Sequence, residues 1–209
     1  IEKSDLQHEI QYDISGMTKQ IRYSLNEVKI TNSLVSRELN YITLGGNKTL
    51  HIRSHNNQLD DLTEKSYSIG VWIKPHDTGD RIQGIVSRPG HHTGIFYKPS
   101  TKVLDSQLQT QAWDEDKLNY TVERDIKSNQ WYYVLMCVDT DSKQIKMYWN
   151  GTEVVDKVNR KYFEKDLLKY ENKIWFIGCS YSEKNYFVGD IADLKFYDRV
   201  LTNEEVEQE

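Results

Sequence analysis

Strict alternation of two residue sets runs through Ser66 to Lys74 and constrains the fold more than any other feature of this sequence. Successive side chains of a strand point to opposite faces of a sheet, so the two sets belong to opposite faces. The sets are Tyr67, Ile69, Val71 and Ile73 on one side, and Ser68, Gly70, Trp72 and Lys74 on the other. The pattern predicts a strand with one packed face, and the other face carries Trp72.

The segment from Trp131 to Asp139 is apolar on both of its faces. Such a strand belongs in the middle of a sheet, because both of its faces are covered. The turn formers of Asp139 to Ser142 follow it, and Ile145 to Trp149 then ends at Asn150 and Gly151. Asn followed by Gly is the pair best able to adopt the positive φ angles of a type I′ turn. These signals predict two consecutive hairpins.

Further strand candidates recur about every dozen residues with turn signals between them, which is typical of a sandwich or barrel. They are Tyr41 to Leu44, Thr49 to Ile52, Ile82 to Ser87, Gly94 to Tyr97, Leu118 to Val122, Lys173 to Gly178 and Tyr186 to Tyr197. Helix is predicted at Glu164 to Tyr170 and at the C-terminus, where Thr202 and Glu205 form a capping box. No linker or internal repeat divides the chain, so residues 1–209 are predicted to form a single domain.

Composition and charge exclude several classes of partner. Lys and Arg number 27 against 32 Asp and Glu, for a net charge of −5, and the basic residues are spread along the chain. This distribution argues against nucleic acid as a partner. The longest apolar run, Trp131 to Val138, is far shorter than the roughly 20 residues of a membrane-spanning helix. Cys137 and Cys179 are interpreted as two buried thiols, with a bridge between strands as the alternative.

Several phrases of the sequence together resemble the laminin-G-like, concanavalin A-like jelly-roll family. In order, they are Asp13 to Gly16, Tyr41 to Gly46, Tyr67 to Pro75, Asn129 to Val134 with Asp139, Ile145 to Gly151, and Phe187 to Leu201. The resemblance implies an all-β fold of two antiparallel sheets packed as a sandwich, one convex and one concave. Members of the family are mostly extracellular or surface modules that bind sugars. A minority are glycoside hydrolases or polysaccharide lyases, and others bind proteins.

The resemblance also implies one structural Ca²⁺ near the edge of a sheet. In this sequence, the matching last-strand carboxylate is Asp193, and backbone carbonyls would come from the turn at Gly45 and Gly46. Calcium accepts six to eight oxygen ligands in flexible geometry, so carbonyls and a single Asp can serve it. The alternative is that Asp193 is a strand-end residue bonded to nearby amides.

The loop from Ser87 to Gly94 has the most unusual local composition in the chain. It links two predicted strands and so belongs at the rim of the sandwich, where binding residues collect. Arg88 could clamp a carboxylate such as that of an acidic sugar, while His91 and His92 could donate to hydroxyls. The alternative is a solvated polar turn.

Trp113 follows a polar run and precedes three acidic residues, so it is a candidate for stacking on a sugar ring. The alternative is a Trp that closes one end of the core. With the rim loop and Tyr97, Trp113 completes the predicted ligand-binding groove. The other tryptophans, Trp72, Trp131, Trp149 and Trp175, lie within patterned strands and are expected mostly in the core, although any on a concave face could join a groove.

Catalysis is not predicted. Hydrolases of the superfamily carry Glu-x-Asp-x-(x)-Glu on one strand, which places the carboxylates on the same face, and no such motif occurs. The leading hypothesis is therefore a lectin-like module that binds a glycan, with acidic glycans among the candidates, within a longer extracellular, cell-surface or virion-associated protein. The alternative is a domain that binds a protein partner or the rest of its own polypeptide. A lyase or hydrolase is the weaker third option.

Overall fold

The computed structural model describes most of the chain from residue 62 onward, together with segments nearer the N-terminus. The described residues are 10–15, 18–23, 29–32, 37–46, 50–52, 62–76, 81–88, 93–108, 118–123, 126–154, 163, 166–167, 169, 175–180 and 185–209.

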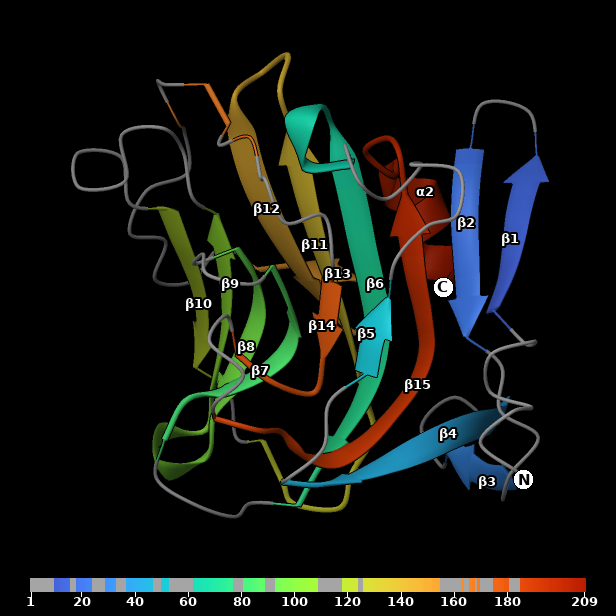
Figure 1. Cartoon of the computed structure of the whole chain (residues 1–209), viewed down its shortest axis with the longest axis vertical. Helices are drawn as coiled ribbons and strands as arrows, with labels where there is room; N and C mark the ends of the chain where they lie inside the picture. The colour runs from blue at the N-terminus through green and yellow to red at the C-terminus, as the bar shows by residue number, and fades with distance from the viewer. Residues whose placement is uncertain are drawn as a thin grey trace.

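Two antiparallel sheets make up the body of the described part of the chain (Figure 1). The seven-stranded sheet has the order β13 (Thr152–Glu153), β12 (Gln144–Trp149), β11 (Tyr132–Asp139), β6 (Tyr67–Pro75), β15 (Val188–Tyr197), β4 (Arg37–Gly45) and β3 (Lys29–Asn32). The six-stranded sheet has the order β10 (Leu118–Glu123), β9 (Val103–Leu108), β8 (Gly94–Lys98), β7 (Gln83–Ser87), β14 (Trp175–Ile177) and β5 (Leu50–Ile52). Short 3-10 turns, η1 (Leu62–Glu64) and η2 (Pro99–Thr101), lie between strands.

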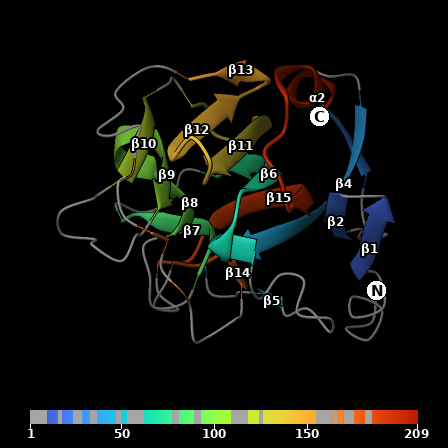
Figure 2. The ribbon, with the colours of Figure 1, turned by 90° about the horizontal axis from the view of Figure 1, so that it is seen from above.

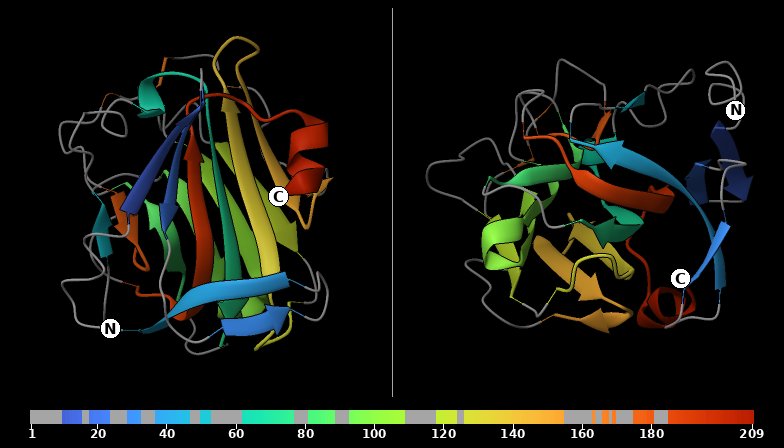
Figure 3. Two further views of the ribbon diagram at one scale, coloured as in Figure 1. Left: turned by 90° about the vertical axis from the view of Figure 1, so that its right-hand side faces the viewer. Right: turned by 90° about the horizontal axis from the view of Figure 1, so that it is seen from below.

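The two sheets pack face to face (Figure 2). The main apolar core, with residues from both sheets, fills the space between them. The fold is therefore the all-β sandwich that the sequence predicted. A hairpin, β1 (Ile10–Ser15) and β2 (Thr18–Tyr23), and the short C-terminal helix α2 (Asn203–Gln208) lie on the outer face of the seven-stranded sheet (Figure 3). Strand β2 lies against β15. No described helix is long and apolar enough to cross a membrane.

The alternation predicted for the central strands is confirmed. Tyr67, Ile69, Val71 and Ile73 of β6 all belong to the core between the sheets, and Trp72 belongs to a second apolar cluster on the outer face. Strand β11 pairs with β6 on one side and β12 on the other, so it lies mid-sheet as predicted. Both faces of these strands are buried, which makes the seven-stranded sheet the middle layer of this half of the molecule.

The predicted turn chemistry is also present. Asn150 and Gly151 both have positive φ, 46° and 83°, at the end of β12. The Asp139 carboxylate accepts hydrogen bonds from the backbone N–H groups of Asp141 (2.9 Å) and Ser142 (3.3 Å) in the turn between β11 and β12. These local bonds fix the register of the two hairpins.

Some predictions of secondary structure were wrong or incomplete. The helix predicted at Glu164 to Tyr170 is absent at the described positions in it, where Asp166, Leu167 and Lys169 are not helical. Strands β1, β2, β3 and β9 were not predicted. The interpretation of the cysteines is confirmed, because Cys137 and Cys179 are buried and neither forms a disulfide. Burial raises the pKa of the Cys137 thiol to about 11, which leaves it unreactive at neutral pH.

Candidate functional site

Aromatic side chains gather on the outer face of the seven-stranded sheet. Alternation along β6 and β11 turns Trp72 and Tyr133 to this face, and their ring centroids lie 5.5 Å apart at an interplanar angle of 43°. Gly70 makes room for them, because a methyl group at this position would overlap the Tyr133 hydroxyl. The small residue and the two rings form one packed unit.

Helix α2 covers part of this aromatic face. Leu201 and Val206 belong to the same apolar cluster as Trp72 and Tyr133, and both are almost fully buried. The predicted capping box is present: Glu205 N–H donates to Thr202 Oγ1, and the Thr202 N–H donates to the Glu205 carboxylate. The helix is therefore fixed both by packing and by its own first turn.

An ion pair ties the same helix to the end of β15. Arg199 donates to both oxygens of Glu205, at 2.6 Å and 2.5 Å. The bond from Arg199, together with the bond from the Thr202 N–H, lowers the pKa of Glu205 to about 2. Glu205 is therefore ionised at neutral pH, and its carboxylate is used to stabilise the helix and not to bind a ligand.

Glu209, just beyond α2, is held against the sheet as well. Its carboxylate accepts hydrogen bonds from the Lys195 ammonium and from the Tyr197 hydroxyl, the latter at 2.6 Å. Burial, and then the bond to Glu209, raises the pKa of Tyr197, so this hydroxyl stays protonated and donates. Lys195 Nζ also lies 3.5 Å from a carboxylate oxygen of Asp193.

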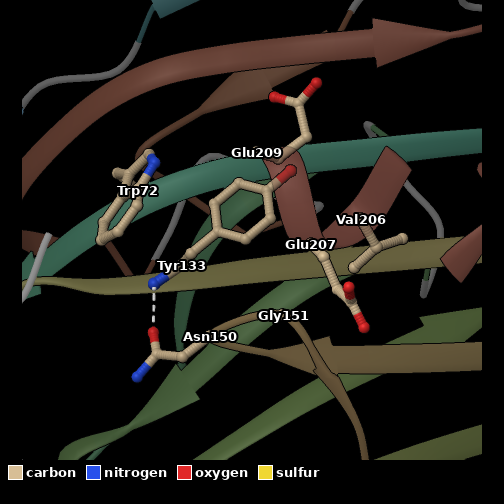
Figure 4. A pocket seen from close by; sticks show the side chains of 7 residues that line it. All are labelled: Trp72, Tyr133, Asn150, Gly151, Val206, Glu207 and Glu209. Carbon is tan, nitrogen blue, oxygen red and sulfur yellow. Dashed lines mark hydrogen bonds between the residues drawn. The ribbon is translucent and has the colours of Figure 1, made fainter. Parts of the chain in front are cut away.

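A pocket of about 280 Å³ opens between α2 and the aromatic face (Figure 4). Its walls come from β6, β11, the turn after β12, and the C-terminal half of the helix. The lining residues are Trp72, Tyr133, Asn150, Gly151, Val206, Glu207 and Glu209. Asn150 Oδ1 accepts from the Tyr133 N–H at 2.8 Å, so the turn is bonded to the strand that forms the floor. The volume is at the lower end of small-molecule sites, which is room for one small ring.

The indole N–H of Trp72 is buried beside this pocket and has no hydrogen-bond acceptor among the described residues. Trp72 as a whole is only 4% exposed. Buried donors are almost always paired, because an unpaired one costs about 1–3 kcal/mol. Figure 4 shows the indole nitrogen on the side of the ring toward Tyr133. A ligand oxygen in the pocket could accept from it.

The described lining of the pocket is acidic. Glu207 is exposed and forms no ion pair or hydrogen bond with any residue that the structure describes. The described lining includes no Lys, Arg or His side chain. Carboxylates accept hydrogen bonds from hydroxyl and ammonium groups, and they repel other carboxylates.

At the opposite end of the aromatic face, a lysine of the protein itself, Lys74, lies over the aromatic rings. Lys74 Nζ lies 5.2 Å from the ring centroid of Tyr41 and 5.3 Å from that of Trp131. The same ammonium lies 2.6 Å from Asp190, whose carboxylate also accepts from Thr43 at 2.7 Å. The charged and hydroxyl groups of Lys74, Asp190 and Thr43 satisfy one another. The buried indole N–H of Trp131 has no acceptor among the described residues either, but Trp131 is not in the lining of the pocket beside α2, which is therefore the stronger candidate for a ligand.

A second pocket of about 280 Å³ lies at the rim of the sandwich, between η1 and the turn that joins β11 and β12. Its charged side chains are of both signs, and Lys169 Nζ lies 3.9 Å from the Glu64 carboxylate. No buried donor without an acceptor lines this second pocket in the part of the chain that the structure describes.

The family is settled by sequence. The family model described as the concanavalin A-like lectin/glucanases superfamily matches residues 44–207. The chain belongs to this family. No curated protein matches the sequence of this concanavalin A-like domain.

Solved structures share the fold at low sequence identity. The CBM40 of the Ruminococcus gnavus IT-sialidase, bound to alpha2,3 sialyllactose, has a TM-score of 0.62 and 15% identity, over 80% of this chain and 94% of that one. The receptor binding domain of a botulinum neurotoxin C/D mosaic serotype has a TM-score of 0.62 and 16% identity, over 94% of this chain and 47% of that one. A mutant of the Streptococcus pneumoniae NanB sialidase has a TM-score of 0.61 and 17% identity; the match covers 81% of this chain but only 27% of the sialidase.

Two residues of the predicted groove are buried in the interior of the concanavalin A-like domain and are not exposed at its rim. Tyr97 is fully buried, because alternation along β8 turns it inward with Ile95. Arg88 is also fully buried; its guanidinium lies 4.4 Å from the ring centroid of Trp175, and Nη2 donates to Thr63 Oγ1 at 3.3 Å. Neither side chain reaches the surface, which contradicts the prediction that they contact a ligand.

The remaining predicted groove residues, His91, His92 and Trp113, lie outside the described residues, and their role stays a prediction. The pocket beside α2 was not predicted as a site. Its signal in the sequence was Trp72 on the outward face of an alternating strand, together with a C-terminal helix that had to cover some apolar surface.

The predicted calcium ligands do not fit a single ion. Gly45 pairs with Val188, whereas Asp193 lies five positions further along β15, roughly 15 Å away at the spacing of a strand. Calcium ligands lie about 2.3–2.6 Å from the ion, so this set cannot share one. Asp193 instead has a φ of 48° at the irregularity in β15 between Ala192 and Lys195. The carboxylate of β15 nearer to Gly45 is that of Asp190, which Lys74 already neutralises.

We therefore expect excess EDTA to leave the melting temperature of the domain unchanged. A calcium ion bound only to the native state would raise the melting temperature through mass action, and its removal would lower it. Differential scanning calorimetry with EDTA and with added Ca²⁺ measures this. A fall of several degrees in EDTA would contradict the expectation and would require ligands other than Asp193, Gly45 and Gly46.

Proposed function

We propose that this domain is a non-catalytic carbohydrate-binding module and that the glycan enters the pocket between α2 and the aromatic face. The observation that carries the proposal is the buried Trp72 N–H beside that pocket, which has no acceptor among the described residues. A sugar hydroxyl would accept from this donor, the edges of Trp72 and Tyr133 would contact the apolar C–H groups of the ring, and Glu207 would accept from a further hydroxyl.

The comparisons support a glycan as the class of ligand. The CBM40 module of similar fold was solved with a sialylated trisaccharide, and the family is named for lectins as well as glucanases. The acidic pocket argues that the sugar held here is not itself acidic. Arg88, the predicted clamp for an acidic sugar, is in the core.

The domain is proposed as one module of a longer protein that acts outside the cell or at its surface. A match that covers 27% of a sialidase and 94% of an isolated CBM40 module is what such a role would produce. The absence of a recognisable hydrolase motif in the sequence supports a binding role rather than catalysis.

The proposal predicts that Glu207→Ala weakens glycan binding about tenfold while leaving the fold intact. Glu207 is exposed, so its removal deletes a hydrogen bond to the ligand with little effect on packing. A glycan array identifies the ligand, and isothermal titration of its best hit measures the affinity of each variant.

Glu204→Ala is the matched control, because Glu204 is also exposed on α2 but does not line the pocket. It should bind as the unaltered protein does. Folded protein that binds no glycan on the array would overturn the proposal in favour of a protein-interaction domain. Equal affinity of the two variants would move the site elsewhere.

A further inference from the structure

The electrostatic character of the pocket restricts which sugar it can hold. Three carboxylates, those of Glu207, Glu209 and Asp193, gather at this end of the outer face. Lys195 contacts two of them, Asp193 and Glu209. Glu207 has no cationic partner among the described residues. Among the described residues, Glu207 is therefore the carboxylate at the opening that a cationic ligand can pair with.

The buried part of the pocket presents the opposite requirement. In the part of the chain that the structure describes, the Trp72 N–H is a donor without an acceptor, so it favours a ligand oxygen rather than another donor. The edges of Tyr133 and Trp72 line the pocket and can contact the carbon skeleton of a ring, and aromatic rings also favour a nearby cation. A fitting ligand thus carries a hydroxyl oxygen at one edge and a positive charge at another.

We propose that the pocket selects an amino sugar with an unacetylated, protonated amine. The ammonium would pair with the Glu207 carboxylate at the opening, and a ring hydroxyl would accept from the Trp72 N–H at the floor. This inference rests on the proposed function and names the ligand class of the same pocket. It differs from an acidic sugar, whose carboxylate would meet Glu207 and Glu209 without a basic side chain in the described lining to receive it.

The test compares glucosamine oligomers with N-acetylglucosamine oligomers of the same length, and with sialyllactose, at about pH 6, where a sugar amine is largely protonated. Binding is followed by titration calorimetry, and occupancy of the pocket by the NMR signal of the Trp72 indole N–H. A Trp72→Phe variant assigns this signal among the five tryptophans of the chain. We expect glucosamine oligomers to bind at least about tenfold more tightly than their acetylated counterparts and to shift the Trp72 signal.

The Glu207→Gln variant removes the charge while keeping a hydrogen-bonding group of the same size. In this variant the ratio of the affinity for glucosamine oligomers to that for N-acetylglucosamine oligomers should fall toward one. In the unaltered protein this ratio should fall as the salt concentration rises. Glu204→Gln, on the same helix but outside the pocket, should keep the full ratio.

The outcomes separate this inference from the proposed function. Neutral oligomers that shift the Trp72 signal with equal or higher affinity would overturn the amino-sugar inference and leave the carbohydrate-binding proposal standing, as would tighter binding of sialyllactose. If no glycan shifts the Trp72 signal, both the pocket and the inference drawn from it are wrong.

Discussion

Replacement of Arg88 by Ala is expected to lower the free energy of unfolding by about 3 kcal/mol and the melting temperature by roughly 10 °C. The side chain is fully buried, and its guanidinium stacks on Trp175, which is fully buried too. The substitution removes this contact and the bond to Thr63, and it leaves a cavity at the end of the core. Thermal and urea unfolding monitored by circular dichroism measure the loss.

Arg81→Ala is the control for this prediction, because Arg81 is exposed just before β7. It should change the unfolding free energy by no more than about 0.5 kcal/mol. An Arg88→Ala protein of normal stability that had lost glycan binding would reverse the assignment, and would restore Arg88 as a ligand-binding residue of the rim.

Replacement of Gly70 by Ala is expected to disrupt the pocket directly. The added methyl group would overlap the Tyr133 hydroxyl, and it would lie only 3.1 Å from Tyr133 Cζ and 3.3 Å from Leu135 Cδ1. The ring must then move away from β6, which removes the floor of the pocket. We expect a loss of about 1–3 kcal/mol in stability from overpacking and a loss of more than tenfold in glycan affinity. Chemical denaturation and titration calorimetry measure the two effects.

The Tyr133→Phe change identifies the cause. In the Gly70→Ala background it removes the oxygen that the methyl group meets, so it should recover part of the lost stability even though Tyr133→Phe alone gains nothing. Independent, additive effects of the two substitutions would show that the Tyr133 hydroxyl is not what Gly70 accommodates.

The central strands could be predicted because their physics is local. Alternation in β6, apolar character on both faces of β11, and the Asn150 and Gly151 turn each require only neighbouring residues. Strands β1 (IQYDIS), β2 (TKQIRY) and β9 (VLDSQL) carry many polar residues, and their pairing depends on partner strands rather than on their own pattern. The prediction of a helix near Asp166 and Leu167 was wrong for a related reason: a weak local helix propensity is overridden by tertiary packing, which the local sequence does not show.

The candidate site was harder to predict than the fold. Arg88 was predicted to bind a ligand because an arginine in a polar loop is normally exposed. No sequence pattern shows that Trp175, 87 positions later, packs against its guanidinium. Asp193 matched a motif, but an irregularity in β15 places it in a backbone conformation that turns it toward Lys195. Trp72 could be assigned to a face from sequence. Its unpaired N–H depends on what covers that face, which the sequence does not state.

One wall of the pocket comes from the sheet and the other from helix α2, and the two walls differ in how freely they can be mutated to change the ligand preference. Trp72 and Tyr133 belong to strands that are buried on both faces, so substitutions there disturb the architecture along with the ligand. Glu207 stands on a solvent-facing turn of α2 whose anchoring depends on other residues, Arg199, Glu205 and Val206. New ligand preferences could therefore be selected from a library confined to the exposed positions of one six-residue helix, with the rest of the protein left as a constant scaffold.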